Sequence, residues 1–556
     1  MAKNGRPDSD ELLFLALGGA GEIGMNLNLY GHAGKWLMVD LGIAFGDEAT
    51  PGIDVIMPDP RFIEERKGDL VGLVLTHAHE DHLGAVPYLW ERLACPIWAT
   101  PFTAAVLRRK LQDIGIGARV PIIEVSMSGR FQAGPFEIEL VTLTHSIPEP
   151  NAIVIRTAAG TVLHSGDWKF DPEPLVGPSS DIEALRRLGE EGVLALVCDS
   201  TNALVAGHSG SEAMVRAELI RLFGRFNNRI AVACFASNVA RVESVVHAAL
   251  AHDRHVALVG RSMRRIVESA QETGYLTGLP PFVSEHDAGY LPREKVALLC
   301  TGSQGEPRSA LARIARNEHP QVTLEPGDAV IFSSRVIPGN EKAIGAVQNN
   351  LARLEVEIVT AEEEAVHVSG HPAREELARM YQLVRPRIAV PVHGERRHLE
   401  SHARLAQECQ VSQALAAENG RVIRLAPGPV EVVGIVEFGR LGLDGSALVP
   451  LEGTLIKQRH RISASGSAVA TLVLGRDGRL LADPQITLHG LVDPQQDGAA
   501  LDSAAAAVRS AIEALRPGQR IDDETVKEAA RLAVRRHIHA ERGKKPLTDV
   551  HLVRVS

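Results

Sequence analysis

The chain has 556 residues, of which 45% are hydrophobic and 23% charged, and its formal net charge is −10. This is an ordinary globular composition, and the length predicts about three or four domains. Aromatic residues make up only 4%, so an extensive aromatic surface for base stacking is not expected. The acidic net charge gives no sign of a nucleic-acid ligand, but it does not exclude one.

The five cysteines are scattered along the chain and form no C-x-x-C pair. This predicts reduced thiols in a cytoplasmic protein, with neither disulfides nor a cysteine zinc site. The apolar stretch near the amino terminus is too short for a signal peptide and follows acidic residues. A run of about 18 apolar residues does not occur either, so the sequence predicts no membrane span.

The first predicted strand, at residues 12–17, leads into a glycine-rich turn, GGAGEIGMN, at residues 18–26. Such a turn could begin a dinucleotide-binding motif, but residues 26–30 and 35–40 predict two further strands where that motif requires a helix. We therefore interpret it as a tight turn that needs the backbone freedom of glycine. Asp40 ends the third strand, where it either caps the strand or orients a metal ligand from behind.

The apolar run LVGLVL at residues 70–75 predicts a buried strand, and the sequence THAHEDH follows it at residues 76–82. Four side chains there can bind metal, namely His77, His79, Asp81 and His82. Imidazole and carboxylate together favour zinc or manganese. His77 and His79 can point at one ion while Asp81 and His82 point at a neighbouring ion. The alternative is a histidine-rich surface turn.

Two more candidate ligands come directly after predicted strands. His145 follows the strand predicted at 136–143, and Asp167 follows the one predicted at 161–164. Taken singly, each is more often a polar residue satisfied by hydrogen bonds, but beside the histidine cluster both are expected to bind metal. A carboxylate can bridge two ions, so Asp167 is the candidate bridge.

From about residue 210, helices predicted at 212–223, 239–251 and 263–272 alternate with apolar runs at 230–235, 255–259, 296–300 and 329–332. This alternation predicts a parallel α/β module, in which ligands collect at the strand ends. The loops at those ends are small and polar, which favours a phosphate or sugar-phosphate ligand, with ordinary turn chemistry as the alternative. They contain Ser237-Asn238, Arg261-Ser262, TGSQGE at residues 301–306 and Ser333-Ser334-Arg335.

Two more histidine motifs follow this module. The sequence HVSGH occupies residues 367–371, and His393 ends the strand predicted at 388–390. At a strand end, His393 could complete the shell of the second metal ion.

The carboxyl-terminal part predicts a linker at 451–467 and then a small separate α/β domain. Its strands are expected at 469–474, 486–492 and 550–555, with helices at 499–515 and 523–541. We favour oligomerisation or support as its role. Its basic run from residue 535 to 545 could contact RNA, although a solvated helix end explains the same pattern.

Together these residues resemble the metallo-β-lactamase superfamily. The H-x-H-x-D-H loop at 77–82, His145, Asp167 and Asp40 are similar to its motif series. The insertion from about 210 to 365, followed by His371 and His393, resembles its nucleic-acid branch, the β-CASP proteins. The turn at 18–26, HVSGH and the sequence PVHGE at 391–395 resemble the bacterial ribonuclease J family in particular. The resemblance covers essentially the whole chain and is weakest in the carboxyl-terminal domain.

This resemblance implies an α/β fold in which a metallo-β-lactamase αββα sandwich carries an inserted β-CASP parallel α/β domain and a small C-terminal α/β domain. The expected boundaries are 1–210 for the first part of the metallo-β-lactamase domain, 211–365 for the β-CASP domain and 366–450 for the returning segment of the sandwich. A linker at 451–467 and the C-terminal domain at 468–556 complete the arrangement.

The resemblance also implies two divalent metal ions per subunit, Zn²⁺ in most members and Mn²⁺ in some. Carried over by position, the first ion is held by His77, His79 and His145, the second by Asp81, His82 and His393, and Asp167 bridges them. His371 is the candidate for phosphate stabilisation and for protonating the leaving group, beside Asp81 and Asp167 as catalytic residues. A purely structural role is its alternative.

The expected substrate-binding residues lie in two segments. The first is HVSGH, that is His367, Val368, Ser369, Gly370 and His371, which would bind the substrate phosphate. Ser237 and Asn238, with Ser369, are expected around a 5′-phosphate. Asp199, which ends the strand predicted at 194–197, resembles the first β-CASP motif and is placed behind the ligands, as Asp40 is.

The main hypothesis is a ribonuclease in which a metal-activated hydroxide attacks the phosphodiester in line. The resemblance implies 5′-to-3′ exonuclease action on single-stranded RNA with a 5′-monophosphate, together with endonuclease cleavage, in rRNA processing and mRNA decay. It further implies a homodimer or homotetramer, with an RNA-degradation complex as a candidate partner. Two alternatives stay open: a small-molecule hydrolase on the same fold, and an RNA-binding scaffold with an inactive site.

Overall fold

The structure, a computed structural model, describes residues 7–493 and 497–555. The chain divides into two compact units, one made of Met1–Ala44 with Met57–Phe438 and the other of Phe45–Ile56 with Gly439–Ser556. Within the described ranges, no helix combines the length and apolar character needed to cross a membrane.

The first unit contains two large sheets. One has eight strands in the order β24 (Glu431–Ile435), β23 (Arg421–Ala426), β1 (Leu12–Gly18), β3 (Leu27–His32), β4 (Lys35–Val39), β7 (Leu70–Val74), β8 (Ile97–Ala99) and β9 (Ile122–Glu124). The other has seven in the order β10 (Arg130–Ala133), β11 (Phe136–Thr142), β12 (Asn151–Thr157), β13 (Gly160–His164), β14 (Ala195–Asp199), β20 (Ile388–Val392) and β22 (Gln413–Ala414).

The two sheets pack face to face through apolar side chains. Phe14 and Val74 of the first sheet share a buried cluster with Ile153 and Val197 of the second. The strands are apolar on both faces because helices cover the outer sides, as expected for buried sheets. These helices are α1 (Arg61–Glu64), α2 (Glu80–Leu83), α3 (Val86–Leu93), α4 (Pro101–Asp113), α5 (Ile182–Glu191), α12 (Arg374–Val384) and α13 (Arg396–Glu408).

Contacts on the outer faces complete an αββα sandwich. Leu185 of α5, Leu377 of α12 and Leu405 of α13 are buried against the outer face of the seven-stranded sheet. On the other side, Trp36 of β4 meets Phe62 of α1 with ring centroids 5.4 Å apart. The predicted metallo-β-lactamase fold is thus confirmed.

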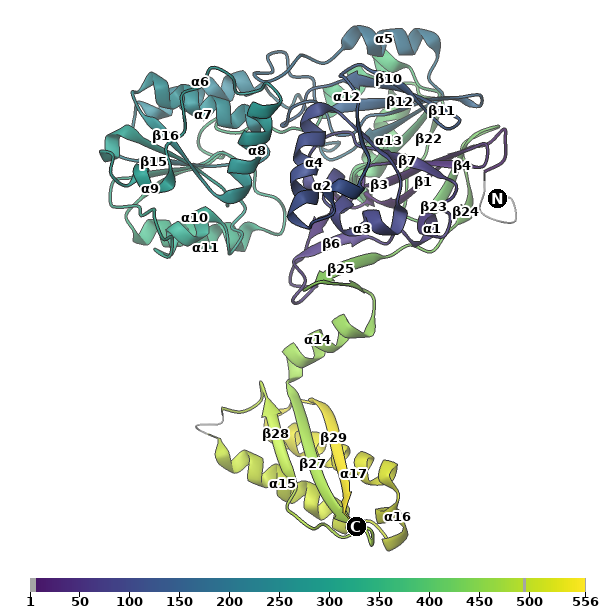
Figure 1. Ribbon diagram of the computed structural model, residues 1–556, viewed down its shortest axis with the longest axis vertical. Helices are drawn as coiled ribbons and strands as arrows, with labels where there is room; N and C mark the ends of the chain where they lie inside the picture. Colours follow the sequence, from purple (N-terminus) through teal and green to yellow (C-terminus); the bar gives the residue numbers. More distant parts are fainter. Residues whose placement is uncertain (1–6, 494–496, 556) are drawn as a thin grey trace. The chain divides into compact units, whose positions relative to one another are not determined.

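A separate parallel sheet is inserted between β14 and β20. Its order is β16 (His255–Val259), β17 (Val296–Cys300), β15 (Ile230–Ala233), β18 (Ala329–Phe332) and β19 (Glu357–Val359), and every neighbouring pair is parallel. Figure 1 shows α6 and α7 on one face of this sheet and α10 and α11 on the other. The helices are α6 (Glu212–Phe223), α7 (Val239–Ala251), α8 (Arg261–Glu272), α9 (Glu285–Ala288), α10 (Ala310–Ala315) and α11 (Glu341–Arg353).

The chain enters and leaves this inserted domain through a buried polar junction. Arg241 of α7 is fully buried, and its guanidinium forms an ion pair with Glu212 at 3.1 Å. The same guanidinium donates to the carbonyl oxygens of Ser333, at 2.7 Å, and Val366, at 3.0 Å. Arg241 therefore connects three segments. They are Glu212 at the start of the inserted domain, Ser333 after β18, and Val366, the residue directly before HVSGH.

The strands of the second unit belong to two smaller sheets. The first has the order β26 (Ala447–Pro450), β25 (Arg440–Asp444), β6 (Val55–Pro58) and β5 (Ala44–Phe45). The second is β28 (Gln485–His489), β27 (Ser467–Gly475) and β29 (Leu547–Val555), on which Val508 of α15 (Gly498–Glu513) and Val534 of α17 (Asp523–Arg542) pack. The short helix α16 (Pro517–Ile521) lies between α15 and α17 in the sequence.

Helix α14 (Thr454–Ser465) occupies most of residues 451–467, where the sequence predicted a linker. The helix contains no glycine or proline, and Gly453 and Gly466 stand at its two ends. Pairing between β25 and β6 also brings residues near 55 beside residues near 440, which no local pattern indicated. The predicted domain boundaries stay predictions.

We predict that the Arg241–Glu212 pair holds the junction of the inserted domain. Glu212→Gln leaves a buried guanidinium without its counter-charge and should cost about 3–5 kcal/mol. Thermal unfolding followed by tryptophan fluorescence measures this as a fall in Tm. The control is Glu243→Gln, which breaks the partly exposed Arg216–Glu243 pair and should cost less than about 1 kcal/mol. Equal shifts in the two variants would contradict the prediction.

Candidate metal centre

Every predicted metal ligand lies just after the carboxyl end of a strand in the sandwich. His77 and His79 follow β7, and the first turn of α2 supplies Asp81 and His82. His145 follows β11, Asp167 follows β13 and His393 follows β20. The two sheets thus bring segments more than 300 residues apart in the sequence to one place.

One group of donor atoms is built from three imidazoles. The Nδ1 atom of His79 lies 3.0 Å from Nε2 of His77 and 3.1 Å from Nε2 of His145. A single lone pair on His79 Nδ1 cannot accept a proton from both neighbours. Two nitrogen ligands of one tetrahedral zinc ion are about 3.3 Å apart, given Zn–N bonds of about 2.0–2.1 Å. The spacing therefore fits an ion held between the three rings.

A second group lies beside the first and shares a carboxylate with it. Nε2 of His82 lies 3.2 Å from Asp167 Oδ2 and 3.5 Å from Asp81 Oδ2. Nε2 of His393 lies 3.5 Å from the same Asp167 oxygen. Asp167 Oδ2 also lies 3.9 Å from His77 Nε2 and 3.8 Å from His145 Nε2. Asp167 thus stands between two ligand sets, as a bridging carboxylate must.

Two buried polar atoms of the cluster are unsatisfied within the described residues. Asp167 Oδ1 and His393 Nε2 are buried and have no hydrogen-bond partner among the described residues. Leaving buried polar atoms unpaired costs free energy, so these atoms fit a cation that would satisfy them. Burial also lowers the pKa of His77 and His145, and that of His79 to about 4, which keeps these imidazoles neutral as metal binding requires.

In four of the five rings, those of His77, His82, His145 and His393, the outward nitrogen has a fixed partner, which sets the ring's tautomer. Asp40 Oδ2 accepts from His82 Nδ1 at 2.7 Å and from the Thr76 hydroxyl at 2.9 Å. That hydroxyl lies 2.9 Å from His77 Nδ1 and is left to accept from it. Asp40 was predicted to orient a ligand from behind, and it contacts His82 directly and His77 through Thr76.

Two orienting groups were missed by the sequence reasoning. Asn26, the last residue of the glycine-rich turn, lies with Oδ1 3.1 Å from His393 Nδ1 and donates from Nδ2 to the carbonyl oxygen of Asp81 at 3.0 Å. The turn itself holds His393, whose backbone N–H donates to the Gly19 carbonyl at 2.6 Å. Gly19 has a φ of +83°, so the interpretation as a glycine-dependent turn agrees with the structure.

The HVSGH segment lies against both ligand sets. The Gly370 carbonyl oxygen is 2.5 Å from His145 Nδ1, and His371 Nδ1 is 2.8 Å from Asp199 Oδ2. Burial alone would lower the pKa of His371, but the carboxylates of Asp199 and Asp167 outweigh it and raise the pKa to about 9. The Asp199 carboxylate thus lies behind the His371 ring and favours its protonated form.

The remaining predicted substrate residues are placed less centrally. Nδ1 of His367 is buried without a hydrogen-bond partner among the described residues. Asn238 caps helix α7 by accepting from the Arg241 N–H at 2.9 Å. Across the described ranges, no hydrogen bond joins Ser237 or Asn238 to the metal cluster.

Four family models match successive parts of the chain. They are the metallo-beta-lactamase superfamily at residues 25–224, the ribonuclease J beta-CASP domain at 227–351, the Zn-dependent metallo-hydrolase RNA specificity domain at 356–414 and the ribonuclease J C-terminal domain at 454–555.

Similar proteins extend over nearly the whole sequence. A ribonuclease J of Sinorhizobium meliloti is 45% identical over 98% of this chain and 98% of its own length. One of Mycolicibacterium smegmatis is 38% identical over 96% of this chain and 95% of its own length. A solved structure of a protein of unknown function from Enterococcus faecalis has a TM-score of 0.52 at 16% identity, covering 74% of this chain and 100% of that one. That likeness supports the fold alone.

The matches follow the architecture, with a sandwich, an insertion, a returning segment and a C-terminal domain. They define a metallohydrolase of the metallo-β-lactamase superfamily that carries a β-CASP insertion. The relative at 45% identity over almost the full length of both chains narrows this class. The chain belongs to the ribonuclease J family, as the sequence predicted. It is a ribonuclease that depends on divalent metal ions.

We predict that Asp40 controls metal affinity through His82 and Thr76. Asp40 has a left-handed backbone with a φ of +62°, which asparagine also tolerates. Asp40→Asn should lower Zn²⁺ affinity by about 10–100-fold without unfolding the chain, because it removes the carboxylate that orients the ligands. Competition with a chromophoric chelator measures this. Asp181→Asn, at the N-cap of α5, is the control and should change nothing.

We further predict that Gly370 must remain glycine. A Cβ atom added there would lie 2.6 Å from His145 Cε1 and 2.7 Å from its Nδ1. Gly370→Ala should therefore displace His145 and lower the amount of metal that copurifies, as measured by mass spectrometry of the purified protein. Gly345→Ala in α11, where nothing lies within 4 Å, is the matched control. Full metal content in Gly370→Ala would refute this prediction.

Proposed function

We propose that the chain is a two-metal ribonuclease that removes nucleotides from the 5′ end of RNA, prefers a 5′-monophosphate and also cleaves internally. The observation that carries the proposal is the pair of ligand groups that meet at Asp167 Oδ2, with His371 beside them. Zn²⁺ is the proposed ion and Mn²⁺ the alternative, because the donors are imidazole nitrogens and carboxylate oxygens.

The ligand roles follow the two groups. His77, His79 and His145 would hold one ion, Asp81, His82 and His393 the other, and Asp167 would bridge them. When bound, two such ions supply charge neutralisation at the scissile phosphate and a nucleophilic water at neutral pH. Asp40 and Asn26 keep the His82 and His393 rings turned toward the centre.

His371 is the proposed proton donor to the leaving oxygen. Its Nδ1 is engaged by Asp199, which leaves Nε2 as the nitrogen that can meet substrate. Asp199 is itself fixed, since its Oδ1 accepts from the Thr201 N–H at 2.8 Å and hydroxyl at 2.7 Å. The aspartate thus positions the imidazole, and the imidazole carries the proton.

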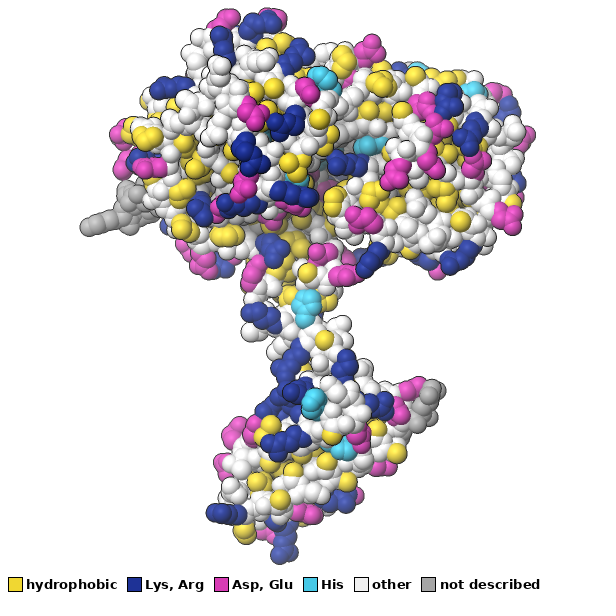
Figure 2. Space-filling model, turned by 180° about the vertical axis from the view of Figure 1, so that it is seen from behind, with side chains coloured by type: hydrophobic (Ala, Val, Ile, Leu, Met, Phe, Trp, Pro, Cys, Tyr) yellow, Lys and Arg dark blue, Asp and Glu magenta, His cyan; other side chains and the backbone are white. Residues whose placement is uncertain are grey.

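A 5′-phosphate is proposed to bind along HVSGH, with Ser237 and Asn238 near it. Burial, and then the charges of Arg241, Lys169 and Arg335, lower the pKa of His367 to about 3. Arg241 and Lys169 are paired with the carboxylates of Glu212 and Asp171, so Arg335 is the cation of this set that an anionic ligand would meet. On the face shown in Figure 2, Lys and Arg side chains are interspersed with Asp and Glu over the larger unit. We therefore expect recognition to rest on this local charge.

The wider biological assignment is part of the same proposal. We place the protein in the cytoplasm, in rRNA processing and mRNA decay, as a homodimer or homotetramer that works alone or in an RNA-degradation complex. Family membership supports this assignment, and the five cysteines are all free thiols, which suits a reducing compartment.

The test is a digest of one RNA whose 5′ nucleotide is labelled and carries either a monophosphate or a triphosphate. Wild type should release labelled mononucleotide from the monophosphate form with Zn²⁺ or Mn²⁺. His79→Ala should lower the rate about a thousandfold, because metal stabilisation of the reaction is worth several kcal/mol. His247→Ala, a half-exposed histidine on α7, is the control and should cleave normally.

Other outcomes would change the proposal. Internal fragments from both forms, without mononucleotide, would indicate an endonuclease with little recognition of the 5′ end. Hydrolysis of small esters with no action on RNA would indicate a small-molecule hydrolase. RNA binding without turnover, with metal supplied, would indicate a scaffold.

A further inference from the structure

Residues 335–339, here called the 335–339 loop, form an exposed tip at the carboxyl end of β18. Arg335 is exposed, and so are Val336 and Ile337, at 40% and 45%. Ligands collect at the carboxyl ends of strands in open parallel sheets. The loop therefore presents one cation and two neighbouring apolar side chains where a ligand of the inserted domain would bind.

The loop is held in one conformation by a buried side chain. Gln304, only 5% exposed, donates from Nε2 to the Arg335 carbonyl oxygen at 2.7 Å and accepts at Oε1 from the Ile337 N–H at 3.0 Å. The carboxylate of Glu341, in the first turn of α11, accepts from the Gly339 N–H at 2.8 Å. These bonds order the loop when the protein folds. Binding a ligand therefore does not carry the entropic cost of ordering it.

Arg335 connects this loop to the HVSGH segment. Its Nη1 donates to Asn202 Oδ1 at 2.9 Å, and the Asn202 amide donates to Ser369 Oγ at 2.8 Å and to the His371 carbonyl at 3.1 Å. Arg335 makes no ion pair with a carboxylate in the part of the chain that the structure describes. A guanidinium has five N–H donors, so the bond to Asn202 leaves most of them available.

We propose that the 335–339 loop binds RNA, with the Arg335 guanidinium on a backbone phosphate and the Val336 and Ile337 side chains against a base. This inference rests on the proposed ribonuclease activity and names part of its substrate surface. A guanidinium binds phosphate oxygens through two parallel N–H donors, and exposed apolar side chains next to it suit the flat face of a base. Asn202 fixes the side chain beside the residues that receive the scissile phosphate.

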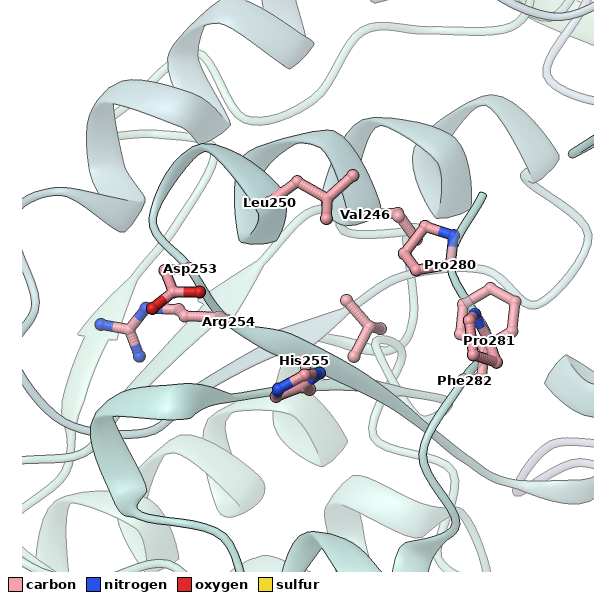
Figure 3. Close-up of a pocket in the computed structure, with 9 residues that line it drawn as sticks. Val246, Leu250, Asp253, Arg254, His255, Pro280, Pro281 and Phe282 are labelled. Atoms are coloured by element: carbon pink, nitrogen blue, oxygen red, sulfur yellow. The ribbon is translucent and has the colours of Figure 1, made fainter. Parts of the chain in front are cut away.

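The other end of the same sheet offers internal controls. A pocket of about 140 Å³ lies there, and Figure 3 shows Val246 and Leu250 from α7 near Pro280, Pro281 and Phe282. Leu250 is 49% exposed, close to the values of Val336 and Ile337. Arg353, exposed at the far end of α11, donates to Asn350 Oδ1 at 2.6 Å much as Arg335 donates to Asn202. The 13 residues of α11 place it about 20 Å from the loop.

The experiment compares Arg335→Ala and the double variant Val336→Ser/Ile337→Ser with Arg353→Ala and Leu250→Ser. Each is assayed on a 5′-monophosphorylated 15-nucleotide RNA and on bis(p-nitrophenyl) phosphate, a small diester too short to reach the loop. Binding to the metal-loaded protein is also measured by fluorescence anisotropy, with a phosphorothioate-linked RNA of the same sequence that resists hydrolysis. Arg335→Lys tests whether charge alone is sufficient.

We expect Arg335→Ala to raise KM and the RNA Kd about tenfold, the value of one charge-assisted hydrogen bond to phosphate. The kcat on RNA, the rate on the small diester and the metal content should stay within twofold of wild type. The slope of log K against log salt should fall by about 0.7, as for one phosphate contact on a single strand. The double variant should raise Kd severalfold without changing that slope.

Two results would overturn the proposal. In the first, Arg335→Ala and Arg353→Ala show the same KM and Kd. In the second, Arg335→Ala lowers kcat while KM and Kd stay constant, which would mean that Arg335 acts on His371 through Asn202 and does not bind RNA. If wild type hydrolyses the small diester but no RNA, the ribonuclease proposal fails, and the anisotropy measurements still decide the loop's role.

Discussion

The central constraint in the structure is a group of buried imidazole nitrogens and carboxylate oxygens that a cation would satisfy. Asp167 Oδ2 lies within 4 Å of ring nitrogens from five histidines, and its other oxygen has no hydrogen-bond partner among the described residues. Burying such a group is costly unless the charge is compensated. The two sheets can keep these strand ends together because a second set of hydrogen bonds, from Asp40, Thr76, Asn26 and Gly370, fixes four of the five ligand rings from behind.

The sandwich and the inserted domain both contribute to this site. The segment that leaves the inserted domain begins with HVSGH, and it reaches the cluster through Gly370 and His371. Its position is set on the other side by Arg241, which bonds the Val366 carbonyl and pairs with Glu212. A buried ion pair contributes little net stability compared with apolar packing, but it specifies geometry, because few other arrangements satisfy it. Here the geometry it specifies is that of the HVSGH segment beside the candidate metal centre.

The sandwich and the inserted domain therefore make different contributions to the candidate metal centre. The sandwich supplies ligands whose pKa values are shifted by burial and by neighbouring carboxylates, and the inserted domain supplies loops at the ends of parallel strands. The 335–339 loop belongs to the inserted domain. Its hydrogen bonds through Asn202 to Ser369 and His371 connect it to the site in the sandwich. RNA is a long polyanion, so a centre that acts on one phosphate gains affinity from separate contacts to its neighbours.

The sequence by itself determined the local elements and the chemistry of the site. The run at 70–75 and the motif after it predicted β7 and four ligands, and helices α6 and α7 have the predicted bounds. Hydrophobic periodicity and short motifs are local properties, so a single sequence carries them. Helices α5 and α12 were not predicted, and helix α14 lies where a linker was predicted, because helices of only 10 to 12 residues depend on tertiary packing for their stability.

Only the tertiary structure decided which atoms meet. It showed that His79 faces the centre with Nδ1 while His77 and His145 use Nε2, that Asn26 turns His393, and that Arg335 reaches Asn202. It also paired β6 with β25, almost 400 residues later. The physical reason is the same in each case. Hydrogen bonds are directional over about 3 Å, and their partners here lie far apart in the chain, where no sequence period links them.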